Sequence, residues 1–177
     1  MIMKKLFYLF SIIAISVAFA ACSSDSAPSD MPSTLKDSAT KTAQMVSAEN
    51  ASTISASDIV FTIDDYAQVA KFSKWIKKGS AHTDSRISFV GLPKDEGFEL
   101  TNIVLELDKG SKNKPRFTIN KITEDKEITD ASYFVFLSEV ADEVAKKGRA
   151  TIKVGAHSNK ALNANIKIKL DINFDLK

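Results

Sequence analysis

The chain has 177 residues, with 24 basic side chains against 22 acidic ones, and a single cysteine. This length suits one ordinary domain, and a single cysteine excludes an internal disulfide. Lys4 and Lys5 are the only charged residues before Cys22. Without these two lysines the charges balance, so the chain lacks the basic field that nucleic-acid binding requires.

Residues 1–21 have the pattern of a secretory signal peptide. Lys4 and Lys5 form a positive start, a mostly apolar run follows, and the small residues Ala20 and Ala21 suit a signal peptidase. The run is short for a bilayer span, which needs about 20 apolar residues. A transmembrane anchor is the alternative, but the stretch that follows is rich in Ser and has no cluster of positive charge.

The residues Phe19-Ala20-Ala21-Cys22 resemble the lipobox of bacterial lipoproteins. In that family the cysteine thiol receives a diacylglycerol, the peptidase cuts before the cysteine, and the new amine takes a fatty acid such as palmitate. One acyl chain binds a membrane marginally, and two or more hold firmly. The resemblance therefore implies lipidation at Cys22, with a free thiol as the alternative. Phe19 departs from the family, in which Leu is commonest.

The sequence Ser23-Ser24-Asp25-Ser26 is similar to the acidic export signals of Bacteroidetes surface lipoproteins. In enteric bacteria an Asp directly after the cysteine resembles an inner-membrane retention signal, and Ser23 stands there instead. The resemblance implies a Bacteroidetes-type outer-membrane lipoprotein, which faces either the periplasm or the cell surface.

Residues 22–57 are predicted to be the lipidated cysteine and a disordered tether. The segment is rich in Ser and Thr and has no aromatic residue, so it offers little apolar surface to offset the entropy of ordering. Asp25-Ser26-Ala27 and Asp37-Ser38-Ala39 resemble the motif at which Bacteroidetes attach O-glycans. They make Ser26 and Ser38 candidate glycosylation sites, and a chance match in a Ser- and Ala-rich segment is the alternative.

A single folded domain is predicted over residues 58–177, and its first half begins with a strand at 59–63. Apolar residues at helical spacing predict a helix over 66–78, with Asp65 as its cap and Gly79 as its left-handed stop. Strands are expected at 86–90 and 98–108. Within the second strand the buried-face apolar residues change from even-numbered to odd-numbered positions, which predicts a bulge near Thr101 or Asn102.

The second half repeats this order of elements. A strand is predicted at 115–122, a helix from Thr129 or Asp130 to Lys147 with Gly148 as its stop, and a strand at 150–155. The last strand, at 164–176, alternates between apolar and polar residues along its whole length. We therefore expect one dry and one wet face.

This order favours an α+β fold, in which two helices cover a mostly antiparallel, six-stranded sheet. Lys77-Lys78-Gly79 matches Lys146-Lys147-Gly148, so the hypothesis includes a duplicated β-α-β-β unit. The alternative takes residues 133–137 as a strand and yields an all-β, immunoglobulin-like sandwich.

Few residues in the predicted domain suggest chemistry. His82 and His157 are the only histidines. His82 and Asp84 offer two metal ligands, but no second ligand pair is spaced nearby. We expect no metal, cofactor or catalytic residue, and no ligand-binding residue can be assigned. The aromatic side chains of the first predicted helix fit core packing better than a sugar-binding platform; they are Tyr66, Phe72 and Trp75.

These observations predict a lipid-anchored, non-catalytic binding module at the outer membrane. Its partners would be membrane lipid, through acylated Cys22, and a glycan or an envelope protein. The alternative is a structural or assembly accessory of a surface complex, such as a fimbria or a glycan-uptake system.

Overall fold

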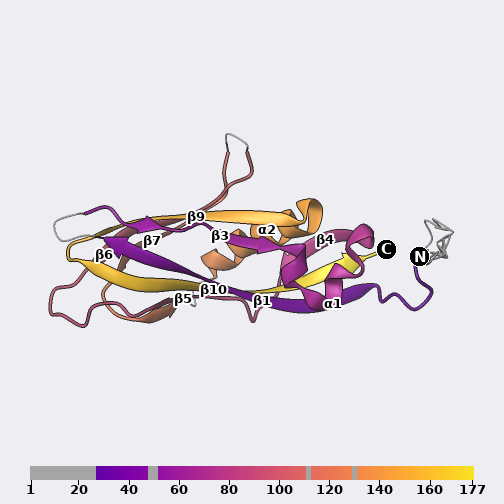
Figure 1. The fold of residues 1–177 in the computed structure, drawn as a ribbon, viewed down its shortest axis with the longest axis horizontal. Coiled ribbons are helices and arrows are strands. Elements are labelled where there is room, and N and C mark those ends of the chain that lie inside the picture. Colours follow the sequence, from indigo (N-terminus) through magenta and orange to yellow (C-terminus); the bar gives the residue numbers. More distant parts are fainter. Residues whose placement is uncertain (1–26, 48–51, 111–112, 129–130) are drawn as a thin grey trace, which may run out of the picture.

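The central strand of the computed structural model is β10 (Leu162–Leu176); the structure describes residues 27–47, 52–110, 113–128 and 131–177. The even-numbered side chains of β10 are buried, and most of the odd-numbered ones are exposed. The prediction of a long strand with one dry and one wet face is therefore confirmed. Figure 1 shows β10 running along the long axis of the molecule beside β1.

Two antiparallel sheets enclose the core. The six-stranded sheet has the order β2-β1-β10-β5-β8, and β4 pairs with β10 on the same side as β5. Its strands besides β10 are β1 (Thr34–Ser47), β2 (Ser55–Ala56), β4 (Ile76–Ala81), β5 (Arg86–Val90) and β8 (Lys126–Ile128). The four-stranded sheet has the order β3-β9-β6-β7. Its strands are β3 (Ile59–Thr62), β6 (Leu100–Leu107), β7 (Arg116–Ile122) and β9 (Arg149–Ser158).

β1 lies in the segment predicted to be a disordered tether, so that prediction is wrong for residues 34–47. Its fourteen residues pair with β10, from Thr34 opposite Asp175 to Ser47 opposite Leu162. The inward side chains include Ala39 and Ala43, which are too small to give a strong apolar pattern in the sequence. β10 supplies the hydrogen-bonding edge and the apolar neighbours that β1 lacks on its own.

Two charged residues on the inward face of β1 also interrupt the alternating apolar pattern by which a strand is predicted from sequence. Lys41 Nζ donates to the Asp65 carboxylate at 2.6 Å, and the backbone N–H of Gln68 donates to the Asp37 carboxylate at 2.8 Å. Burial raises the pKa of Asp65, but hydrogen bonds from Lys41 and from Thr62 outweigh it and leave that pKa below its usual value. Each charge therefore has a partner that only the fold provides.

Residues 66–78 do not form the predicted helix. α1 spans only Ala67–Ala70, a 3₁₀ turn follows at Ser73–Trp75, and β4 begins at Ile76. Gly79 lies inside β4 and is not among the residues with positive φ. Residues from Ile76 onward pair with β10 instead, so tertiary context overrides the helical spacing.

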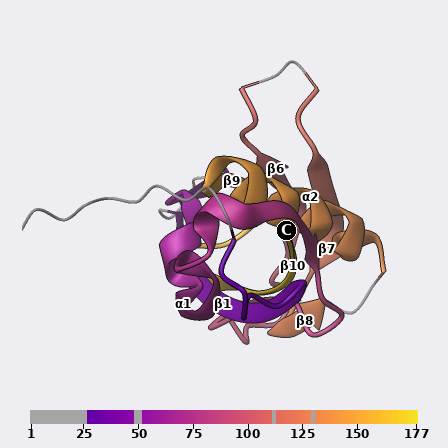
Figure 2. The same ribbon diagram turned by 90° about the vertical axis from the view of Figure 1, so that its right-hand side faces the viewer.

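The second predicted helix is confirmed as α2 (Ser132–Lys147). It ends at Gly148, whose φ is 72° and whose N–H donates to the carbonyl of Val144. The expected caps Thr129 and Asp130 lie outside the described residues. α2 packs on β4 of one sheet and on β9 of the other, so it fills one edge of the sandwich rather than covering a sheet face (Figure 2).

The prediction of an α+β fold with a duplicated β-α-β-β unit is therefore wrong. The two Lys-Lys-Gly segments have different roles, because Gly148 stops a helix and Gly79 lies in a strand. The alternative of an all-β sandwich has the right two-sheet architecture, but the strand that it required at 133–137 is part of α2. The strand β5 and the bulge in β6 are confirmed, since the β6–β9 register shifts between Thr101 and Val104.

Gly79 generates a stability prediction because β4 approaches α2 closely there. A Cβ at this position would lie 2.5 Å from the Ala141 carbonyl oxygen and 2.9 Å from Ala145 Cβ. We expect Gly79→Ala to lower the free energy of unfolding by about 1–3 kcal/mol, as overpacking does, measured by urea denaturation. Gly155→Ala is the matched control: it adds a Cβ in β9 with no atom within 4 Å. Equal losses in the two variants would contradict close packing at Gly79.

Candidate functional site

The structure describes only part of the predicted modification sites. Cys22 and Ser26 lie outside the described residues. Ser38 lies on the outer face of β1, and its Oγ donates to Asp171 Oδ1 at 2.6 Å. A glycan on Ser38 would remove that hydrogen bond. O-glycosylation at Ser26 and Ser38 stays a prediction, as does lipidation at Cys22.

A cluster of charged side chains surrounds Asp171 on the outer face of β10. Asp171 is only 3% exposed, and it binds Ser38 Oγ and Lys169 Nζ, the latter at 3.0 Å. Lys36 Nζ lies 2.7 Å from Asp84 and 4.0 Å from Asp171. The hydrogen bond from Lys36 holds the pKa of Asp84 below its usual value. Two ammonium groups thus balance two carboxylates.

The fold brings Asp171 close to His82 and Asp84, the two possible metal ligands identified in the sequence. Ligand atoms of His82, Asp84 and Asp171 all lie within 4.8 Å of one another. The carboxylates, however, already accept hydrogen bonds from Lys36 and Lys169. A metal ion would have to displace both ammonium groups, so the arrangement fits a charge-neutral structural cluster. The expectation that no metal binds stays a prediction.

Ser85 bridges the gap between β4 and β5 along β10. Its Oγ donates to the Asp171 carbonyl at 3.0 Å and accepts from the Asp171 N–H at 3.1 Å. The same carbonyl accepts from the His82 N–H at 2.7 Å. The Tyr133 hydroxyl of α2 donates to the Ser85 carbonyl at 3.1 Å. The buried Ser85 side chain therefore makes the hydrogen bonds to β10 that a strand residue would make, in the interval between the end of β4 and the start of β5.

A cavity of about 290 Å³ lies between the two sheets where their outer strands meet. β7 pairs only with β6, and β8 pairs only with β5, so each presents an unpaired edge within the described sheets. Residues 123–125 carry the chain from β7 to β8. We call this region the seam and define it by its lining residues: Phe117, Thr118, Ile119, Asn120, Lys126, Ile128 and Ser132.

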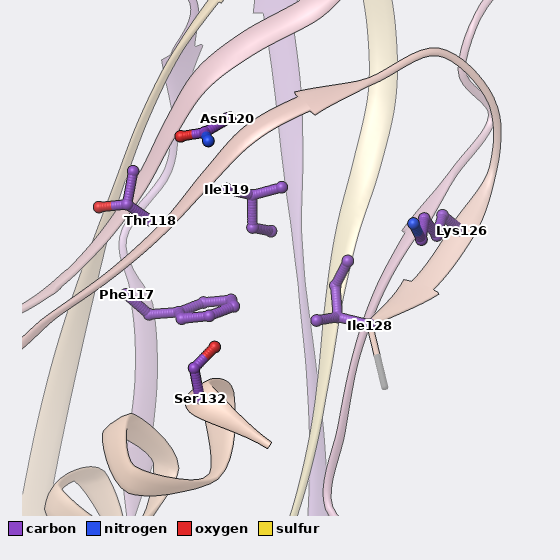
Figure 3. Close-up of a pocket in the computed structure, with 7 residues that line it drawn as sticks. All are labelled: Phe117, Thr118, Ile119, Asn120, Lys126, Ile128 and Ser132. Carbon is purple, nitrogen blue, oxygen red and sulfur yellow. The ribbon is translucent and has the colours of Figure 1, made fainter. Parts of the chain in front are cut away.

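The seam has an apolar floor and a polar rim. Figure 3 shows Phe117, Ile119 and Ile128 grouped around the cavity, with Ser132 entering from the start of α2. Phe117 and Ile128 are buried, while Ile119 is half-buried. Phe117 also packs near Phe136 of α2, with ring centroids 6.4 Å apart. The floor is thus part of the core and is partly open to solvent.

Sequence reasoning missed the seam. It placed Phe117 and Ile119 within the strand predicted at 115–122, but it had no means of placing β7 at an edge. β8 has three residues, too few for a periodic signal. Because strand order decides which backbone edges stay unpaired, no local pattern of residues could have identified this region.

The remaining predicted site residues are separate from the seam. Tyr66 is fully buried and meets the Phe174 ring edge-on at 5.4 Å, which confirms its assignment to the core. Phe72 and Trp75 are half-buried. His157 lies in β9, in the other sheet from the strands that flank His82.

Comparison with known proteins gives no identification. No family model matches the chain, and no curated protein is similar to it. Among solved structures, the decameric BFDV capsid protein matches with a TM-score of 0.37 and 7% identity, over 80% of this chain and 97% of that one. Desmodium yellow mottle tymovirus gives 0.30 and 11%, over 99% and 96% of the two chains. Scores this low carry no argument about fold or function.

None of the described helices has the length and apolar character needed to cross a bilayer.

Ser85 gives the stability prediction for the charged cluster. Ser85→Ala removes the bridge and leaves the buried N–H of Asp171 without its partner. We expect a loss of about 1–3 kcal/mol in the free energy of unfolding, measured by urea denaturation. The control is Ser88→Ala in β5, whose side chain makes no hydrogen bond within the described residues. The control should change the free energy by less than about 0.5 kcal/mol. A neutral Ser85→Ala would disprove the bridging role.

Proposed function

We propose that this chain is a lipid-anchored protein of the bacterial outer membrane whose β-sandwich is a non-catalytic interaction module. The lipobox-like sequence supports the anchor. The observation that carries the binding role is the seam, where two unpaired strand edges flank a cavity with an apolar floor. Such edges bind an extended segment of a partner by strand addition, and a neighbouring pocket selects its side chains.

The chemistry of the seam favours binding over catalysis. Among the described residues that line it, only Lys126 has a charged side chain, and the other polar groups are the hydroxyls of Thr118 and Ser132 and the amide of Asn120. General acid–base catalysis most often uses His, Asp or Glu. The described residues that line the seam include none of these three types.

A polypeptide fits the seam better than a glycan does. Unpaired strands offer backbone donors and acceptors in the register of another strand. Sugar binding draws on exposed aromatic faces, and Phe117 is only 6% exposed. We therefore favour an envelope protein as the partner. A protein partner is also consistent with the alternative function, that of an assembly accessory of a surface complex.

The anchor is tested with Cys22→Ser in the producing bacterium. We expect the wild-type chain in the membrane fraction, with a mass that includes the acyl chains, and the variant in the soluble fraction without them. Ser23→Ala is the control and should stay in the membrane. A Cys22→Ser chain that is still membrane-bound would refute acylation as the means of attachment.

The seam is tested by site-specific photo-crosslinking of the full chain in cells. A crosslinker at Asn120, on the rim, should trap one dominant envelope protein, whereas one at Thr42, on the exposed face of β1, should not. Ile119→Arg places a charge beside the apolar floor and should reduce the Asn120 product at least about tenfold. An unchanged unfolding transition serves as the folding control. Equal products from Asn120 and Thr42, or a product insensitive to Ile119→Arg, would exclude the seam.

A further inference from the structure

Four lysines follow one another closely in the sequence, from the end of α1 into β4. Lys71, Lys74, Lys77 and Lys78 are all exposed, and they fall within eight residues. None of the four forms an ion pair with another described residue, whereas Lys36, Lys41, Lys146 and Lys147 all do. Lys71 Nζ lies instead over the Phe72 ring, 4.9 Å from its centroid. We call these four lysines the basic end.

Aromatic side chains accompany the basic end. Phe72 and Trp75 are half-buried, so each offers part of its ring at the surface. Lysines beside partly exposed Trp and Phe are the composition of segments that rest in a membrane interface. A solvated charged surface does not need the aromatic component.

The fold places the basic end where the chain arrives from Cys22. The Leu176 N–H donates to the Ser33 carbonyl at 2.8 Å, and the Lys177 N–H donates to the Trp75 carbonyl at 3.1 Å. The start of β1, the C-terminus and Trp75 therefore lie together, at the right of Figure 1. Ten residues separate Cys22 from Ser33, and the eleven Cα–Cα steps between the two can span at most about 40 Å.

We propose that the basic end docks the domain on the anionic phospholipid headgroups of the membrane that holds Cys22. The inference rests on the proposed lipid anchor, which keeps this end close to the bilayer and gives it a high effective concentration there. Each lysine near an anionic surface adds attraction that falls off within a Debye length. The opposite end of the domain lies farther away by the length of β10, whose fifteen residues span about 50 Å.

Nearby acidic residues offset only part of this charge. Asp175 stands opposite Lys78 in the β4–β10 ladder, and Asp64 is exposed in the 3₁₀ turn before α1. Lys77 lies at the register shift of the same ladder and has no cross-strand partner there. Lys71 and Lys74 precede β4 and lie outside the ladder. Anionic headgroups would supply the counter-charge that the described residues lack.

Trp75 provides a direct readout, because it is the only tryptophan in the chain. The experiment uses the unlipidated chain from residue 23 to 177, which contains every described element, so its result does not depend on acylation. Vesicles of phosphatidylglycerol mixed with phosphatidylcholine should bind this chain and let brominated lipid quench Trp75. Pure phosphatidylcholine vesicles should do neither, and added salt should release the chain.

A charge-matched pair of variants isolates the basic end. Changing Lys71, Lys74, Lys77 and Lys78 to Gln should weaken vesicle binding at least about tenfold. The control changes the same number of lysines elsewhere, at Lys94, Lys121, Lys153 and Lys167, and should bind as the parent does. Unfolding transitions of both variants confirm that they fold.

Three outcomes would overturn the proposal. They are equal loss of binding in the two variants, binding without quenching of Trp75, and binding to an acidic polysaccharide in place of the vesicles. The Cys22→Ser fractionation reports separately on the anchor, so loss of docking and loss of the lipid anchor give different results.

Discussion

The antiparallel pairing of β1 with β10 is the interaction on which the rest of the structure depends. β10 presents an unbroken row of buried apolar side chains, and β1 satisfies one of its backbone edges over fourteen residues. The other edge is divided between β4 and β5, with Ser85 closing the interval. Buried backbone groups must be paired, so this arrangement lets one strand organise the whole six-stranded sheet.

The second constraint is the open edge between the two sheets, and α2 covers part of this edge. The helix packs on β4 and β9, and Gly79 allows the approach to β4 because it has no side chain. Gly148 then reverses the chain into β9. The seam lies at the N-terminal end of α2, since Ser132 is both the first residue of the helix and part of the cavity lining. One feature of the packing therefore creates the candidate binding surface.

The proposed roles follow from where these features lie. The start of β1 and the basic end share one end of the molecule, while the seam lies between β7 and β8. A domain held at its basic end would keep the seam exposed to the aqueous compartment. The Asp171 cluster has internally balanced charge, and its contacts fit a role in holding β4 and β5 on β10. Anchoring, orientation and binding are thus assigned to different residues.

The sequence by itself determined the elements whose signal is local. The alternation in β10, the bulge in β6 and the glycine stop of α2 all reflect backbone geometry or a single amphipathic pattern. Tertiary structure decided the rest. β1 is a strand because β10 and Asp65 supply partners far away in sequence. Residues 76–81 leave the predicted helix because β10 offers them an edge. The seam exists because strand order leaves one edge of β7 and one edge of β8 unpaired, and strand order is a property of long-range contacts that no window of residues contains.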